Sequence, residues 1–341
     1  MSSKLVTVFG ATGTQGSAVL RSLQSNTSNT FKLRGITRNP SSDSAKDLSS
    51  FGIETVQADG WDKASLVSAF EGSWGAFVNT NSEDPVILNP EDGRTESKLG
   101  KIIVDAAVEA KVEVFVYSGF NSVKEITKGE ISAPGYDDKS AIFEYAKSTG
   151  AFKSVICASP GWYFESFLMT NVGKVFGGFP FIPSEDGTYV FRVPKWGGKE
   201  DVPFLAVADD FGDIVHGIFL EPEKWDGRVA QGVSQIGTFD EAVKAFEKAT
   251  GKTSRFEAIE NWKDLNVYGI PSLENVKLMF AFTQVSGGRY FGDETEVETS
   301  IALKKKGAAA RGKAGEEMKL STLESFFTRE FGKRRPTKSP L

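Results

Sequence analysis

The sequence has 341 residues, of which 40% are hydrophobic and 25% charged, and its formal net charge is −5. This composition is typical of a globular protein with enough apolar residues for one large or two smaller domains. The single cysteine, Cys157, excludes an intramolecular disulfide, and the single histidine, His216, excludes a His-rich metal site. No apolar run approaches the roughly 20 residues that span a bilayer. We therefore expect a cytoplasmic protein with no bound metal and no membrane association.

The first element is a short apolar run, residues 6–9, which leads into three glycines spaced three apart. In a strand–loop–helix unit the first glycine permits a sharp turn and the second lets bare backbone approach a phosphate. The third lets the following helix pack close to the sheet, with its N–H groups and positive dipole end facing the anion. A glycine-rich turn without a ligand is the alternative. The predicted phosphate-binding residues are Gly10, Thr12, Gly13, Thr14, Gln15 and Gly16.

Strands and helices alternate through the first 160 residues. Further strands are predicted at 31–38, 53–57, 75–79, 112–117 and 152–158, and helices at 44–51, 63–70, 94–110 and 139–148. Strict alternation predicts an α/β fold, a Rossmann-type doubly wound parallel sheet. We therefore assign residues 1–160 to a dinucleotide-binding domain. Cys157 lies in an apolar run and is expected to be a buried hydrophobic residue.

Beyond Pro160 the alternation stops. Residues 173–203 are rich in glycine, proline and aromatic residues, which predicts irregular loops and short hairpins. Helices are predicted at 209–220, 238–250, 272–285 and 320–331, and residues 304–313 fit either a helix or a mobile segment. We predict that residues 161–331 form a smaller α+β lobe for a substrate or a partner. The helix near 209–220 is expected to return to the core, with His216 in a packing or surface role rather than a catalytic one.

The C-terminal region is basic. From residue 304 onward there are eleven Lys or Arg and four Glu residues, a net charge of +7, which leaves −12 on residues 1–303. An acidic body argues against direct binding of nucleic acid. Residues 332–341 are a basic tail, either a solvated terminus or, at 333–336, a nuclear-import patch that would add a nuclear location to the cytoplasmic one.

The end of the second predicted strand indicates which dinucleotide binds. An NAD site usually places Asp or Glu there to hold the ribose 2′-hydroxyl. This chain has Thr37, Arg38 and Asn39 at that place, and no carboxylate from Gly16 through Ser42. An arginine pairs with a 2′-phosphate and stacks on adenine. The sequence therefore predicts NADP(H), with a merely solvated Arg38 as the alternative.

Several short motifs in order are similar to those of a known family. They are the residues 10–16, 37–40, 58–62, 80–81, 100–101, 117–119 and 160–161. Together they resemble the NmrA-like branch of the atypical short-chain dehydrogenase/reductases, over about residues 4–331. The family contains NADPH-dependent reductases and redox sensors that regulate transcription through protein partners.

The resemblance also implies roles for single residues. The glycine loop, Thr37 and Arg38 would hold phosphates, and Asp59 would flank the adenine. Thr80 and Asn81 would run beside the nicotinamide half of the cofactor. Lys139 would contact the nicotinamide ribose, and the turn that begins at Pro160 would lie beside the nicotinamide ring.

The usual catalytic pair of short-chain reductases is missing. None of the seven tyrosines has a lysine four residues later, although Tyr136 lies three residues before Lys139. Three outcomes stay open: Tyr136 supplies the proton from the preceding loop, Lys139 supplies it, or nothing is catalysed. Ser118, at the end of the fifth predicted strand, is a further catalytic candidate, or a hydroxyl satisfied by nearby backbone.

Three aromatic residues follow the turn at Pro160. Trp162, Tyr163 and Phe164 are expected either to wall a substrate pocket or to be core. Two hypotheses for function result. The first is an NADPH-dependent oxidoreductase acting on a small apolar or aromatic carbonyl or enone. The second is a non-catalytic NADP(H) redox sensor that binds a regulatory protein partner.

Overall fold

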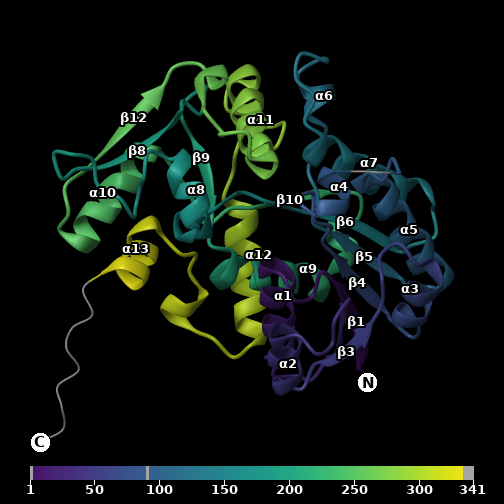
Figure 1. Cartoon of the computed structure of the whole chain (residues 1–341). Helices are drawn as coiled ribbons and strands as arrows, with labels where there is room; N and C mark the ends of the chain where they lie inside the picture. Colours follow the sequence, from purple (N-terminus) through teal and green to yellow (C-terminus); the bar gives the residue numbers. More distant parts are fainter. Residues whose placement is uncertain (1–2, 90–91, 333–341) are drawn as a thin grey trace, which may run out of the picture.

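A seven-stranded parallel sheet forms the core of the first half of the chain (Figure 1). The computed structural model describes residues 3–89 and 92–332. The strand order is β10-β6-β5-β4-β1-β2-β3, so the chain reverses direction across the sheet between β1 and β4. The strands are β1 (Lys4–Phe9), β2 (Phe31–Thr37), β3 (Glu54–Gln57), β4 (Gly75–Val78), β5 (Val114–Tyr117), β6 (Ser154–Pro160) and β10 (Val229–Gly232). The predicted Rossmann-type fold is confirmed.

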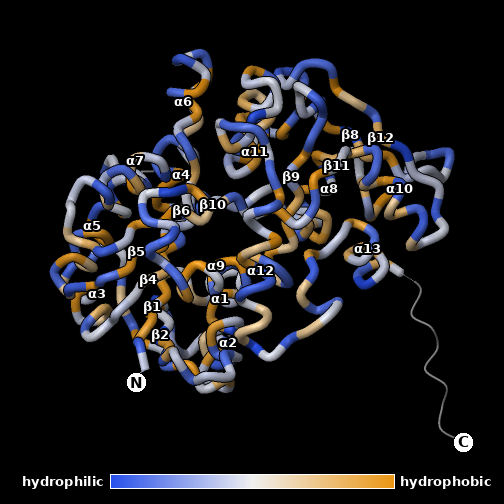
Figure 2. Tube along the Cα trace, turned by 180° about the vertical axis from the view of Figure 1, so that it is seen from behind, coloured by the Kyte–Doolittle hydropathy of each residue, from blue (hydrophilic) through white to orange (hydrophobic). Residues whose placement is uncertain are grey.

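Helices cover both faces of this sheet. One face packs against α1 (Thr14–Gln24), α2 (Asp43–Ser50) and α9 (Gly212–Leu220). The other face packs against α3 (Lys63–Phe70), α5 (Glu96–Glu109) and α7 (Pro134–Ser148). Short helices α4 (Pro85–Leu88) and α6 (Val123–Ile126) lie in the connections. Figure 2 shows hydrophobic residues along the central strands β1 and β4, as expected for strands buried on both faces.

The second lobe combines two small sheets with helices. One sheet pairs β7 (Trp162–Tyr163), β9 (Val202–Leu205) and β11 (Gln235–Gly237). The other pairs β8 (Tyr189–Pro194) with β12 (Ser254–Ile259) in parallel. The helices are α8 (Thr170–Val175), α10 (Phe239–Thr250), α11 (Pro271–Ser286) and α13 (Leu323–Phe331). The N-cap of α10 is Thr238, and Glu241 completes a capping box with it.

Three elements from the second half of the chain pack with the first. We expected one of them, the helix near 209–220, and α9 packs against α1. The sequence did not predict β10, which pairs with β6, or the position of α12 (Glu298–Ala310) against α9. Both views place α12 between the sheet and the second lobe (Figures 1 and 2). The domain boundary at residue 160 stays a prediction.

Two local predictions are settled by the structure. The expected hairpins in residues 173–203 are wrong, because β8 pairs in parallel with β12, far along the chain. Residues 304–313 were expected to be either a helix or a mobile segment. Their first part, to Ala310, is helical and forms the end of α12. The basic residues 333–336 lie outside the described residues. Of the helices in residues 3–89 and 92–332, none has the length and apolar character needed to cross a bilayer.

Candidate functional site

The glycine loop forms an open connection between β1 and α1. Gly10 has a positive φ of 78°, and a Cβ there would lie 2.7 Å from the Asn79 carbonyl oxygen. A Cβ on Gly16 would lie 2.2 Å from the Gly10 carbonyl oxygen, so only glycine permits this close approach of helix and strand. Gly13 is the N-cap of α1 and has no side chain to satisfy the first N–H groups. Thr12 and Thr14 are exposed, whereas the Gly13 N–H donates to the Gly10 carbonyl at 3.1 Å, so the amides of Thr12 and Thr14 are the ones open to an anion.

A cavity of about 310 Å³ opens beside this loop, where the strand order reverses. It is lined by residues that follow the carboxyl ends of β1, β2, β3 and β4. This is where doubly wound sheets bind dinucleotides. Of the predicted cofactor residues, the cavity brings together Gly10, Thr12, Thr37, Arg38, Asp59 and Asn81. The sequence did not single out Trp61, Asn79 or Asp84, which also line it.

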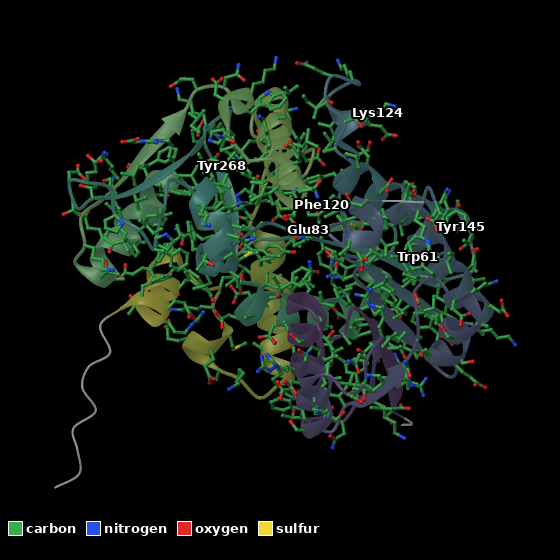
Figure 3. All side chains as sticks on the ribbon, in the orientation of Figure 1. Trp61, Glu83, Phe120, Lys124, Tyr145 and Tyr268 are labelled. Atoms are coloured by element: carbon green, nitrogen blue, oxygen red, sulfur yellow. The ribbon has the colours of Figure 1, made fainter. Side chains whose placement is uncertain are left out.

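Arg38 and Asp59 line the cavity after two neighbouring strands, β2 and β3. The Arg38 side chain is 73% exposed, and its Nη1 lies 3.0 Å from Asp84 Oδ2. The Asp59 carboxylate accepts a hydrogen bond from the Trp61 backbone N–H at 2.9 Å. The Trp61 ring lies 5.0 Å from the Arg94 guanidinium carbon. Figure 3 labels Trp61 on the sheet domain, and Glu83 and Phe120 nearer to the second lobe.

Lys139 is held in a buried polar network behind Asn81. Its ammonium donates to Glu96 Oε1 at 2.6 Å and to the carbonyl and hydroxyl oxygens of Thr80 at 2.8 Å and 3.1 Å. The Thr80 hydroxyl also bonds to the Tyr117 hydroxyl at 2.8 Å. Lys139 is 7% exposed and Glu96 1% exposed. The structure therefore brings the predicted Lys139 and Thr80 together, and adds Glu96.

Glu96 was not predicted from the sequence, although a signal was present. Glu96 falls on the same stripe of α5 as Leu99, Gly100 and Ile103, all of which are buried. A carboxylate on the buried stripe of an amphipathic helix needs a partner, because an unpaired buried charge is costly. Lys139 on α7 is that partner.

Tyr136 lies near Lys139 but does not have the properties of the usual catalytic tyrosine. Because α7 begins at Pro134, Tyr136 is part of this helix and not of the preceding loop. Its ring packs 4.7 Å from that of Phe120 and 6.2 Å from that of Tyr290. Burial raises the pKa of Tyr136, and a hydrogen bond from Tyr290 opposes this rise in part. A general acid works best with a pKa near the operating pH, so this shift weighs against Tyr136 as the proton donor.

The aromatic residues after Pro160 have different environments. Tyr163 receives a hydrogen bond at 2.5 Å from the Gln15 amide, which links the glycine loop to the second lobe. Trp162 and Phe164 lie in the aromatic core of that lobe, 5% and 0% exposed. Trp162 packs 5.0 Å from Phe167, and Phe164 packs 5.1 Å from Phe326. This placement favours the core alternative for Trp162 and Phe164, and leaves Tyr163 as the substrate-pocket candidate.

The remaining predicted residues sit at strand ends. Ser118 directly follows β5, is 1% exposed, and donates its backbone N–H to the Val78 carbonyl. Pro160 ends β6 and pairs in register with Gly232 of β10. Neither residue lines the cavity beside the glycine loop. Both lie at the same edge of the sheet as that cavity, because all seven strands are parallel.

The relatives of this chain agree with this architecture. The family model described as the NmrA-like family matches residues 2–326. The chain belongs to the NmrA-like family. It is 47% identical over 332 residues to the NmrA-like family domain-containing oxidoreductase FrzB of Cladobotryum sp., covering 96% of this chain and 98% of FrzB.

Two solved structures resemble this NmrA-like chain in fold. One is NmrA, a negative transcriptional regulator, in complex with NADP, with a TM-score of 0.71 and 19% identity, covering 97% of this chain and 96% of NmrA. The other is the Escherichia coli NADPH-dependent quinone oxidoreductase QOR2 complexed with NADPH, with a TM-score of 0.65 and 19% identity. It covers 96% of this chain and 100% of QOR2.

Proposed function

We propose that this NmrA-like protein binds NADP(H) in the cavity beside the glycine loop. The observation that carries the proposal is Arg38 at the end of β2, in a cavity that Gly10 and Thr12 of the glycine loop also line. A phosphate on the adenosine ribose would pair with the guanidinium, and the diphosphate would lie on the helix N-terminus. Support comes from NmrA and QOR2, which were solved with NADP and NADPH.

We propose further that the protein is an oxidoreductase for a small apolar or aromatic carbonyl or enone compound. The name of FrzB supports the oxidoreductase activity, and the substrate class is proposed from the aromatic side chain of Tyr163. The nicotinamide half of the cofactor, which supplies or accepts a hydride, would pass Asn81 and Thr80 toward Lys139. Glu96 and Thr80 hold the Lys139 ammonium in one position, which suits a group that orients the ribose and places positive charge near a carbonyl.

A non-catalytic redox sensor is the second candidate. The observation that favours it is that both candidate proton donors are engaged: Lys139 bonds to Glu96 and Thr80, and Tyr136 packs against Phe120 and Tyr290. In this case the protein would distinguish NADP⁺ from NADPH and pass the difference to a protein partner.

A turnover assay distinguishes the two candidates. Purified protein is incubated with NADPH and a panel of aromatic aldehydes, enones and quinones, and the loss of NADPH absorbance is followed. We expect turnover with at least one compound, and a loss of about 100-fold in kcat/KM in Lys139→Ala. The matched control is Lys147→Ala, on the same helix, where the lysine bonds to Glu144 at the surface.

Two outcomes would contradict these expectations, the first for the role of Lys139 and the second for the oxidoreductase itself. Turnover that survives unchanged in Lys139→Ala would remove Lys139 from the reaction. NADPH binding without turnover across the whole panel would favour the redox sensor, which is then tested by comparing the affinities for NADP⁺ and NADPH.

A further inference from the structure

Arg38 is paired with a carboxylate from a distant part of the chain. Asp84, which follows β4, places its Oδ2 at 3.0 Å from Arg38 Nη1. Both residues line the cavity, and the Asp84 side chain is 16% exposed. The sequence around β2 predicted no carboxylate near the 2′-phosphate position. The fold supplies one from 46 residues away.

The Asp84 carboxylate is held in place by the backbone around it. The Asp84 backbone N–H donates to the Asn81 carbonyl at 3.2 Å. Asp84 Oδ1 accepts the Val86 N–H at 3.1 Å and caps α4, which leaves Oδ2 directed at Arg38. The carboxylate is therefore a fixed part of the cavity wall and not a mobile surface group.

The charges of the residues that line the cavity explain why the contact between Asp84 and Arg38 should affect phosphate binding. Among its described lining residues, Arg38 is the cation and Asp59 and Asp84 are the anions. Asp59 uses one oxygen to accept the Trp61 N–H. An incoming 2′-phosphate would need the guanidinium that Asp84 contacts, and like charges a few ångströms apart repel. A ribose 2′-hydroxyl, in contrast, donates a hydrogen bond to a carboxylate without such repulsion.

We propose that Asp84 is a specificity-determining residue that competes with the 2′-phosphate for Arg38 and narrows the preference for NADP(H) over NAD(H). This proposal rests on the proposed cofactor site. Arg38 attracts the extra phosphate, and Asp84 offsets part of that attraction. The ratio of the two affinities is then set by a pair of residues rather than by Arg38 alone.

The test is the Asp84→Asn variant, because the amide oxygen of asparagine preserves the cap on α4 while the charge is removed. Dissociation constants for NADPH and NADH are measured by calorimetry on the full chain. We expect NADPH to bind about threefold to tenfold more tightly, and NADH to bind equally or more weakly. The gain should shrink at about 0.5 M salt, because the pair is partly exposed.

The matched control is Asp43→Asn. This change removes the same charge next to Ser42, which lines the cavity, but Asp43 is fully exposed and pairs with Lys46 instead. We expect its two affinities to stay within about twofold of those of the unmodified protein. If Asp43→Asn raised the affinity for NADPH equally, net charge alone would explain the effect of Asp84→Asn. That result would overturn the proposal.

Three further outcomes would overturn it. One is an unchanged or weaker NADPH affinity in Asp84→Asn. The second is an undiminished gain when Asp84→Asn is introduced into Arg38→Ala, because competition requires the guanidinium. The third is no binding of either dinucleotide to the unmodified protein, which would remove the proposed function as well. If only the Asp84→Asn result differs from the expected one, the proposed binding of NADP(H) is not affected.

Discussion

Lys139 and Glu96 are both almost inaccessible to water, and each compensates the charge of the other. Desolvating two charges is expensive, and their attraction offsets the cost only while both are present. The Thr80 oxygens complete the coordination of the ammonium, and Glu96 Oε2 is buried without a partner among the described residues. A pair held in this way is suited to placing a charge rather than to stabilising the fold.

We predict that Glu96→Gln destabilises the protein by about 3 kcal/mol, because it leaves the Lys139 ammonium buried with only neutral partners. The double variant Glu96→Gln, Lys139→Met should recover at least half of this loss, since both charges are removed. Urea denaturation at neutral pH measures both values. The control is Glu144→Gln, which breaks the exposed pair with Lys147 and should cost less than about 0.5 kcal/mol. A double variant less stable than Glu96→Gln would contradict this account.

Arg38 and Lys139 were predicted from the sequence as site residues, whereas the carboxylates that pair with them were not. The position of Arg38 follows from counting strands after the glycine loop. The contacts from Asp84 to Arg38 and from Glu96 to Lys139 join residues 46 and 43 positions apart. Such contacts depend on how loops and helices meet in space, which local pattern does not determine.

The helix α9 is buried on two sides, between α1 and α12. A Cβ on Gly212 would lie 2.3 Å from the Ala18 carbonyl oxygen, and one on Gly217 would lie 2.4 Å from the Leu303 carbonyl oxygen. The backbones therefore touch at both glycines. A helix that returns to the core was predicted here, but not its second contact, for which the pair of glycines was the signal.

His216 was expected to have a packing or a surface role, and the structure shows the packing role. It is 0% exposed, and its Nε2 accepts a hydrogen bond from the Asn26 amide at 2.9 Å. Its Nδ1 lies 3.1 Å from the hydroxyl of Ser22, which donates to Asp213 at 2.5 Å. Burial lowers the pKa of His216 to about 4, and the nearby Asp213 opposes this shift in part. The imidazole is therefore neutral in the folded protein at neutral pH.

This shift predicts a specific loss of stability in acid. The unfolded chain binds the proton near pH 6.5, whereas the folded chain binds it near pH 4. The stabilisation is complete above the unfolded pKa and is lost as the pH falls from about 6.5 toward 4. Between about pH 7 and pH 5 the unmodified protein should lose about 2 kcal/mol more than His216→Gln, measured by urea denaturation. Parallel pH profiles would contradict the assignment.

Elements with a strong period were predicted, and elements defined by distant partners were not. The α3 helix lies at the expected residues 63–70, and α10 begins at Phe239, one residue after the predicted start at 238. The parallel pair of β8 and β12 was missed, because the glycine, proline and aromatic residues around β8 are equally typical of loops. Parallel strands need a crossover, here a long segment that includes α9, β10 and α10, and no short-range signal identifies the partner strand.

At the scale of the whole molecule, the cavity proposed for the cofactor lies on the sheet domain, and the second lobe contacts this domain at α1. Gln15, in the first turn of α1 directly after the glycine loop, donates a hydrogen bond to Tyr163 and so links this end of α1 to the second lobe. Elements from both halves of the chain are interleaved through β10, α9 and α12. These packed elements, and not a flexible linker, therefore join the second lobe to the sheet domain.

The central claim is that Arg38 holds a phosphate on the adenosine ribose. Calorimetric titration of the unmodified protein and of Arg38→Ala with NADPH and with NADH tests it most directly. We predict that Arg38→Ala weakens NADPH binding by at least about tenfold and changes NADH binding by less than about twofold. Equal losses for the two dinucleotides, or no loss for NADPH, would contradict the assignment of the cavity.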